Sequence, residues 1–98
     1  MRSIIFTSFA QKEVVEALDW YERESSGLGR KFGTAIEESI QRIRDNPGQF
    51  PIVRRNIRRA LLNRFPYALM FIVKADETVS VIACFHGSRD PMKWRERA

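Results

Sequence analysis

The sequence predicts an α+β fold in which a helical hairpin packs on a small, mainly antiparallel four-stranded sheet, in the order β-α-α-β-β-β, with a short C-terminal helix. Two observations predict this class. The first half holds two segments with apolar residues at helical spacing, joined by the short connection SSGLG. The second half holds three short apolar runs separated by turn residues, as is typical of strands. The 98 residues suit one domain, and we expect a single domain over residues 1–98.

The N-terminal segment predicts a strand followed by a helix. Residues 2–6 (RSIIF) form a short apolar stretch with β-branched side chains, which is typical of a strand. Ser8, with Gln11 three positions later, matches a capping box and predicts the helix start. The apolar residues that then recur at helical spacing are Ala10, Val14, Ala17, Leu18 and Tyr21. Gly27 is suited to a left-handed cap, so the helix should end before it.

A second helix is predicted to begin near Leu28. Its apolar stripe consists of Phe32, Ala35, Ile36, Ile40 and Ile43. Pro47 and Gly48 within DNPGQFP end this helix, because proline cannot continue a helix and glycine permits a turn. Since the connection between the two helices is short, they should form an antiparallel hairpin.

Three further strands are predicted in the second half. Residues 56–62 (NIRRALL) can alternate between two faces, which is a weak strand signal. Residues 68–73 (ALMFIV) follow Pro66 and are continuously apolar, which indicates burial on both faces of the sheet or a partner that covers one face. Residues 74–78 (KADET) predict a hairpin turn, and residues 79–85 (VSVIACF) predict the last strand.

The two faces of the 68–73 strand bear on partner binding. One face carries Leu69, Phe71 and Val73, and the other carries Met70 and Ile72. A helical hairpin covers only one face of a sheet, so one set should enter the core and the other should approach a partner. The sequence alone leaves open which set does which.

The charge of the chain is unevenly distributed. Residues 1–49 carry a net charge of −1 and residues 50–98 a net charge of +6, which together give the overall +5. Five arginines without an acidic neighbour lie close together: Arg54, Arg55, Arg58, Arg59 and Arg64. Such a cluster can attract an anionic partner, either a nucleic acid or an acidic protein surface, or it can be an ordinary solvated strand face.

The composition also argues against several classes of protein and of binding site. No apolar run is long enough to span a bilayer, and the stretch after Arg2 is too short for a signal peptide. Cys84 is the single cysteine, so it cannot form an internal disulfide; a buried thiol in the reducing cytoplasm is expected. There is no Cys/His cluster for a metal and no glycine-rich phosphate loop, so no metal and no cofactor are expected.

The segment VIACFHGSRDPMKW (81–94) carries the candidate chemistry. Its strand delivers His86, the single histidine, to one end of the sheet, and Arg89 follows three residues later. In a metal-free ribonuclease His86 could act as acid or base, while Arg89 and Arg58 hold phosphate charge. In the alternative, HGSRDP is a connector, and Asp90 before Pro91 caps a terminal helix over residues 91–98.

Three segments in this order resemble the RelE/ParE superfamily of toxins from type II toxin–antitoxin modules. They are DWYERESSGLGRKF (19–32), RRALLNRFPYALMF (58–71) and VIACFHGSRDPMKW (81–94), and the resemblance covers nearly the whole chain. It implies a cytoplasmic toxin that a small antitoxin wraps and neutralises in a hetero-oligomer. It also implies one of two targets: ribosome-bound mRNA, which RelE-like toxins cleave, or DNA gyrase, which ParE-like toxins inhibit without being nucleases.

One departure from the nuclease pattern favours the ParE-like alternative. RelE-like nucleases usually carry an arginine just inside the third strand, where this sequence has Ala68. Trp94 falls near the C-terminal aromatic position of the nucleases, and an indole is no general acid. We therefore predict a non-catalytic gyrase inhibitor, with a RelE-like endoribonuclease and a stand-alone basic nucleic-acid-binding module as alternatives. The predicted target- or antitoxin-binding residues are Arg54, Arg55, Arg58, Arg59, Arg64, Met70, Phe71, Arg89 and Trp94.

Overall fold

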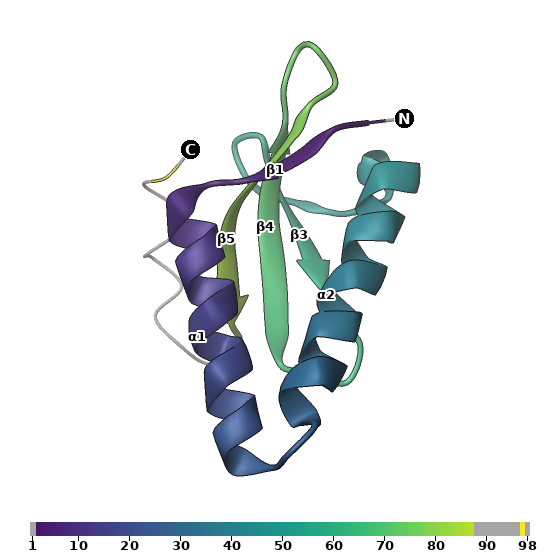
Figure 1. Cartoon of the computed structure of the whole chain (residues 1–98). Coiled ribbons are helices and arrows are strands. Elements are labelled where there is room, and N and C mark those ends of the chain that lie inside the picture. The colour runs from purple at the N-terminus through teal and green to yellow at the C-terminus, as the bar shows by residue number, and fades with distance from the viewer. Residues whose placement is uncertain (1, 88–96, 98) are drawn as a thin grey trace.

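A computed structural model describes residues 2–87 and Arg97 (Figure 1). Two helices precede most of the sheet in the chain, and both cover the same face of that sheet (Figure 1). The α+β class and the helical hairpin are therefore confirmed. The predicted terminal helix over 91–98 lies, apart from Arg97, outside the described residues.

The first helix, α1, spans Ser8–Glu24 and follows strand β1 (Ile4–Phe6) directly. Its N-cap is Thr7, whose side-chain oxygen accepts a hydrogen bond from the Ala10 amide at 3.2 Å. The predicted capping box starting at Ser8 is wrong by one residue, because two adjacent hydroxyl residues can each serve as a cap. The side-chain amide of Gln11 instead donates through Nε2 to the Phe6 carbonyl at 3.1 Å, which ties the helix to the end of β1.

The second helix, α2, spans Leu28–Asp45 and starts where the sequence predicts. Gly27 has a φ of 89°, so the left-handed residue expected between the helices is confirmed. Glu22 of α1 closes the hairpin, because its carboxylate accepts hydrogen bonds from the amides of Gly27 and Gly29 at 3.0–3.1 Å. An acidic group at this place satisfies amides that the start of α2 would leave unpaired.

The sheet has five strands rather than the predicted four. Their order across the sheet is β1-β5-β4-β3-β2, with β1 parallel to β5 and the other neighbours antiparallel. The remaining strands are β2 (Ile52–Arg54), β3 (Ile57–Leu61), β4 (Tyr67–Val73) and β5 (Val79–His86). The additional strand is β2, which follows a short 3-10 turn at Pro47–Gln49. Its three residues carry too little alternation to be recognised in the sequence.

Apolar side chains are buried on both faces of the sheet. The larger cluster lies between the sheet and the helices and includes Phe32, Ile43, Leu69 and Phe71. The smaller cluster includes Ile57, Ala68, Met70, Ile82, Ala83 and Phe85. Ile82 and Ala83 are consecutive in sequence, yet both belong to this cluster. They share it because the register of β4 and β5 shifts between Met70 and Phe71. The continuous apolar run of β4 thus reflects burial on both faces.

Candidate functional site

The arginines predicted to bind a partner lie on and around the hairpin of β2 and β3. We call residues 52–61 the arginine hairpin; it carries Arg54, Arg55, Arg58 and Arg59. Arg54 ends β2, and Arg55 occupies the turn with a φ of 51°. Arg64 lies apart from them, in the turn between β3 and β4, with a φ of 69°. Arg54, Arg55, Arg59 and Arg64 are exposed, and none pairs with a carboxylate among the described residues.

Arg58 differs from these arginines, because it supports the fold. It is half-buried, and its guanidinium donates to the Phe50 carbonyl at 2.6 Å. Phe50 itself belongs to the larger core cluster, where its ring lies edge-on to that of Phe71. Arg58 therefore anchors the segment that precedes β2 to β3, and this guanidinium has a structural partner.

Arg59 faces the side of the sheet away from the helices. It pairs across the strands with Met70, and its neighbour on the same face, Leu61, is 61% exposed. Exposed apolar side chains on this edge of the sheet also include Ile52 at 54%. The arginine hairpin thus combines positive charge with exposed aliphatic surface, which suits contact with a protein surface.

His86 is the last residue of β5, as the sequence predicts. Its backbone is in register with Tyr67, and the two rings lie edge to face with centroids 5.1 Å apart. The Gly87 amide donates to the Pro66 carbonyl at 2.8 Å, so the chain leaves the sheet in a fixed direction after the histidine. The structure thus holds the imidazole half-buried at one end of the sheet.

The structure does not bring Arg58 to His86. Arg58 pairs with Phe71 across β3 and β4, whereas His86 pairs with Tyr67 across β5 and β4. Four residues along a strand and two strand spacings separate the two backbones, on the order of 15 Å. The predicted nuclease set is therefore not assembled at these two positions. Its third member, Arg89, lies outside the described residues, as does Trp94.

Met70 and Phe71 were both predicted to meet a partner, but the structure places both side chains inside the protein. Phe71 is fully buried beneath the helices, and Met70 is only 4% exposed on the other face. The expectation that one side of β4 is an exposed apolar surface is therefore wrong. The large apolar side chains that are exposed lie elsewhere: Ile5, Phe9, Val15, Trp20, Ile52 and Leu61.

The sequence reasoning missed a groove between α1 and β5, which we call the α1–β5 groove. Its volume is about 520 Å³. Phe9 and Trp20 of α1 line it and are 60% and 47% exposed, and His86 and Cys84 line it from β5. A signal was present: Phe9 and Trp20 are eleven residues apart, so they share a face of α1, and that face is otherwise polar.

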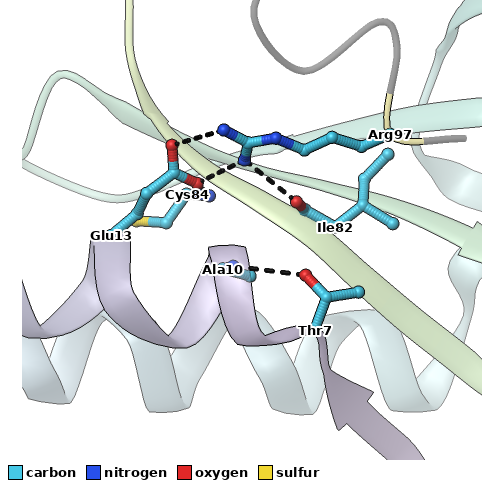
Figure 2. A network of polar contacts seen from close by, with 6 residues as sticks. All are labelled: Thr7, Ala10, Glu13, Ile82, Cys84 and Arg97. Carbon is cyan, nitrogen blue, oxygen red and sulfur yellow. Dashed lines mark hydrogen bonds and ion pairs between the residues drawn. The ribbon is translucent and has the colours of Figure 1, made fainter.

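A polar network lies in this groove (Figure 2). Glu13 of α1 accepts a hydrogen bond from the Cys84 amide at 3.1 Å and forms an ion pair with Arg97 at 2.7 Å. Arg97 also donates to the Ile82 carbonyl at 3.2 Å. β1 pairs only with Val79–Val81 of β5, so these side chains satisfy strand groups that β1 does not reach. Neither Glu13 nor Arg97 was among the predicted residues.

The Cys84 thiol beside this network has low reactivity. Burial raises its pKa to about 12, and the nearby Glu13 carboxylate adds to the rise. A thiol with such a pKa remains protonated at neutral pH, so it is a poor nucleophile. The expectation of a buried, unpaired cysteine is confirmed.

The described part of the chain offers neither a membrane span nor a metal site. No helix there is long and apolar enough to cross a membrane. No group of three or more His, Cys, Asp or Glu side chains among residues 2–87 and 97 is placed to hold a metal ion.

Comparison with known proteins identifies the family. The model of the ParE toxin of the type II toxin–antitoxin system parDE matches residues 4–91. A search of curated proteins found no match. Among solved structures, a chain of the chromosomal ParDE toxin–antitoxin system from P. aeruginosa is similar, with a TM-score of 0.70 and 20% identity over 88% of this chain and 96% of that chain. Because the family match spans nearly the whole chain, the protein belongs to the ParE toxin family of type II toxin–antitoxin systems.

Proposed function

We propose that this ParE-type toxin acts in the cytoplasm by binding and inhibiting DNA gyrase, and that a cognate antitoxin neutralises it in a hetero-oligomer. The observation that carries the non-catalytic mechanism is the position of Arg58. Its guanidinium donates a hydrogen bond to the Phe50 carbonyl, and its backbone is far from that of His86. Among the residues that the structure describes, His86 is the candidate general acid or base. Ala68, which stands where RelE-like nucleases usually carry an arginine, is buried.

The exposed arginines support recognition of a large anionic or mixed surface. Arg54, Arg55 and Arg59 project from one edge of the sheet, and none has a carboxylate partner among the described residues. Exposed ion pairs contribute about 0–1 kcal/mol each, so affinity would come from several of them together with Leu61 and Ile52. An antitoxin partner is supported by the family and by the similar solved chain, which comes from a ParDE toxin–antitoxin system.

Induction of the toxin in cells separates inhibition of gyrase from cleavage of mRNA. We expect plasmid DNA to lose negative supercoils within minutes, while translated mRNAs stay intact when their 5′ ends are mapped. Co-expression of the antitoxin should abolish the change in supercoiling. Rapid cleavage of translated mRNA at defined codons, with supercoiling unchanged, would replace this proposal by a ribosome-dependent ribonuclease.

A paired substitution tests the arginine hairpin. Changing Arg55 and Arg59 together to serine removes two exposed charges without touching the Phe50 bond of Arg58. We expect slower association with gyrase, most clearly at low salt, because screening weakens long-range attraction. Changing Arg30 and Lys31 on the exposed surface of α2 is the charge-matched control. Equal association rates for both double variants at every salt concentration would exclude a role of the hairpin.

A further inference from the structure

Arg97 occupies a site with three distinct elements of guanidinium recognition. Glu13 binds it with both carboxylate oxygens, at 2.7 and 3.2 Å from the two terminal nitrogens. The Ile82 carbonyl accepts a third hydrogen bond at 3.2 Å. The Phe9 ring lies 4.9 Å from the guanidinium carbon. A planar fork of donors matches this arrangement, whereas the ammonium group of lysine cannot satisfy both oxygens and stack on the ring in the same way.

The site is held by rigid elements on both sides. Glu13 lies in the second turn of α1, and its Oε1 atom also accepts the Cys84 amide of β5. The hydrogen bond from the Cys84 amide therefore fixes the Glu13 carboxylate between helix and strand, whether or not a cation is bound to it. Figure 2 shows the network bridging α1 and β5, with the guanidinium reaching Glu13 and Ile82 together. Such a preorganised site loses little entropy when it binds an arginine.

The surrounding groove favours a cationic, extended ligand. Apart from Arg97, the charged residues that line it are the acids Glu13, Glu16 and Asp19 and the bases Lys12 and Arg23. Without Arg97 these three acids exceed the two bases by one, so the groove that a ligand arginine would enter carries a net charge of −1 in a chain whose net charge is +5. Beyond Val81 no described strand continues β1 alongside β5, and side chains instead meet the Ile82 carbonyl and the Cys84 amide. Because side chains already bond these two groups, an extended segment that lies along β5 here would bind through its own side chains and not by adding a strand.

We propose that this site, formed by Glu13, the Ile82 carbonyl and Phe9, is an arginine-binding site for the antitoxin. In the isolated chain Arg97 fills it. In the complex an arginine of a basic, extended antitoxin segment takes the place of Arg97, and that segment lies along β5 in the α1–β5 groove. Exposed Phe9 and Trp20 supply apolar contact on either side of the site. The assignment to the antitoxin rests on the proposed function, whereas the arginine site itself rests on the contacts above.

Short peptides test the site without antitoxin or gyrase, so the result does not depend on the proposed function. The full chain carrying Arg97→Ala is titrated with the capped peptide Ac-Val-Arg-Val-NH2, and the Cys84 amide is followed by NMR. We expect a saturable shift of this amide, because its acceptor Glu13 receives the new guanidinium. The corresponding lysine peptide should bind about tenfold more weakly, and the norleucine peptide should produce no shift.

Three variants serve as controls for this titration. Glu13→Gln added to Arg97→Ala should abolish the shift, whereas Arg23→Ala, which keeps Arg97 in place, should show almost no peptide binding. Arg97→Gln replaces Arg97→Ala if the latter melts below the assay temperature. Equal binding of the arginine and norleucine peptides, no shift at saturating peptide, or a shift that persists without the Glu13 carboxylate would each overturn the proposal.

Discussion

At the residue scale, burial lowers the reactivity of the Cys84 thiol, which lines the α1–β5 groove. Its pKa of about 12 means that a roughly thousandfold smaller fraction is thiolate at pH 8 than in the unfolded chain, where an ordinary thiol is near 9. We expect iodoacetamide to modify the native protein at least that much more slowly than the urea-unfolded protein, as followed by mass spectrometry. Similar rates in both states would show that the thiol is accessible and that this part of the groove is open to solvent.

The stability of the helical hairpin depends on pH through the ionisation of Glu22. Hydrogen bonds from the amides of Gly27 and then Gly29 lower the pKa of this carboxyl below its usual 4.5. A lowered folded-state pKa means that the stabilisation is complete above the unfolded pKa and is lost as pH falls through the folded value. Thermal melting of Glu22→Gln should therefore show a deficit at pH 7 that shrinks below pH 4. A deficit that stays constant down to pH 2 would contradict this role.

At the element scale, two glycines of the hairpin should respond oppositely to alanine. Gly27 has a φ of 89° and open space around its missing side chain, so Gly27→Ala should destabilise by about 1–2 kcal/mol through backbone strain alone. Gly33 lies within α2, and an added methyl would meet Leu18 at an ordinary 3.7 Å, so Gly33→Ala should stabilise by about 0.5–1 kcal/mol. Urea denaturation measures both changes. A loss of stability in the Gly33 variant comparable to that at Gly27 would contradict this assignment.

The elements also show which features a sequence can specify. Both helices and the strands β3, β4 and β5 follow from periodicity and turn residues, because each is long enough to display a pattern. β2 was missed because three residues display no period. The Glu13–Arg97 pair was missed for a different reason: the partners are 84 positions apart, and only the docking of α1 beside β5 brings them together.

The same distinction applies to the arginines. Their clustering in the sequence predicts a basic surface that either attracts an anionic partner or is a solvated strand face, and Arg54, Arg55 and Arg59 are all exposed on the hairpin of β2 and β3. The sequence does not reveal that Arg58, unlike Arg59, bonds to the Phe50 carbonyl. Alternation along a strand separates the neighbours onto opposite faces, and the turn before β2 decides which one finds a carbonyl.

At the scale of the whole molecule, burial on both sheet faces moves the expected binding surfaces to the edges and to α1. Phe71 and Met70 are buried on opposite faces, so Phe71→Ser and Met70→Ser should each lower the free energy of unfolding by about 2–5 kcal/mol. Leu61→Ser, at a 61% exposed position, is the control and should change stability little. A native-like melting temperature for Met70→Ser would show that its face is open after all.

We propose that this member of the ParE family inhibits gyrase as a bound protein and not as a nuclease. The most direct measurement is a titration of purified toxin into ATP-dependent supercoiling of relaxed plasmid by purified gyrase, with an aliquot added to ribosomes translating a defined mRNA. We predict concentration-dependent loss of supercoiling, reversed by antitoxin, and full-length mRNA throughout. Unimpaired supercoiling at toxin in large excess over gyrase, together with codon-specific cleavage of the mRNA, would contradict the account.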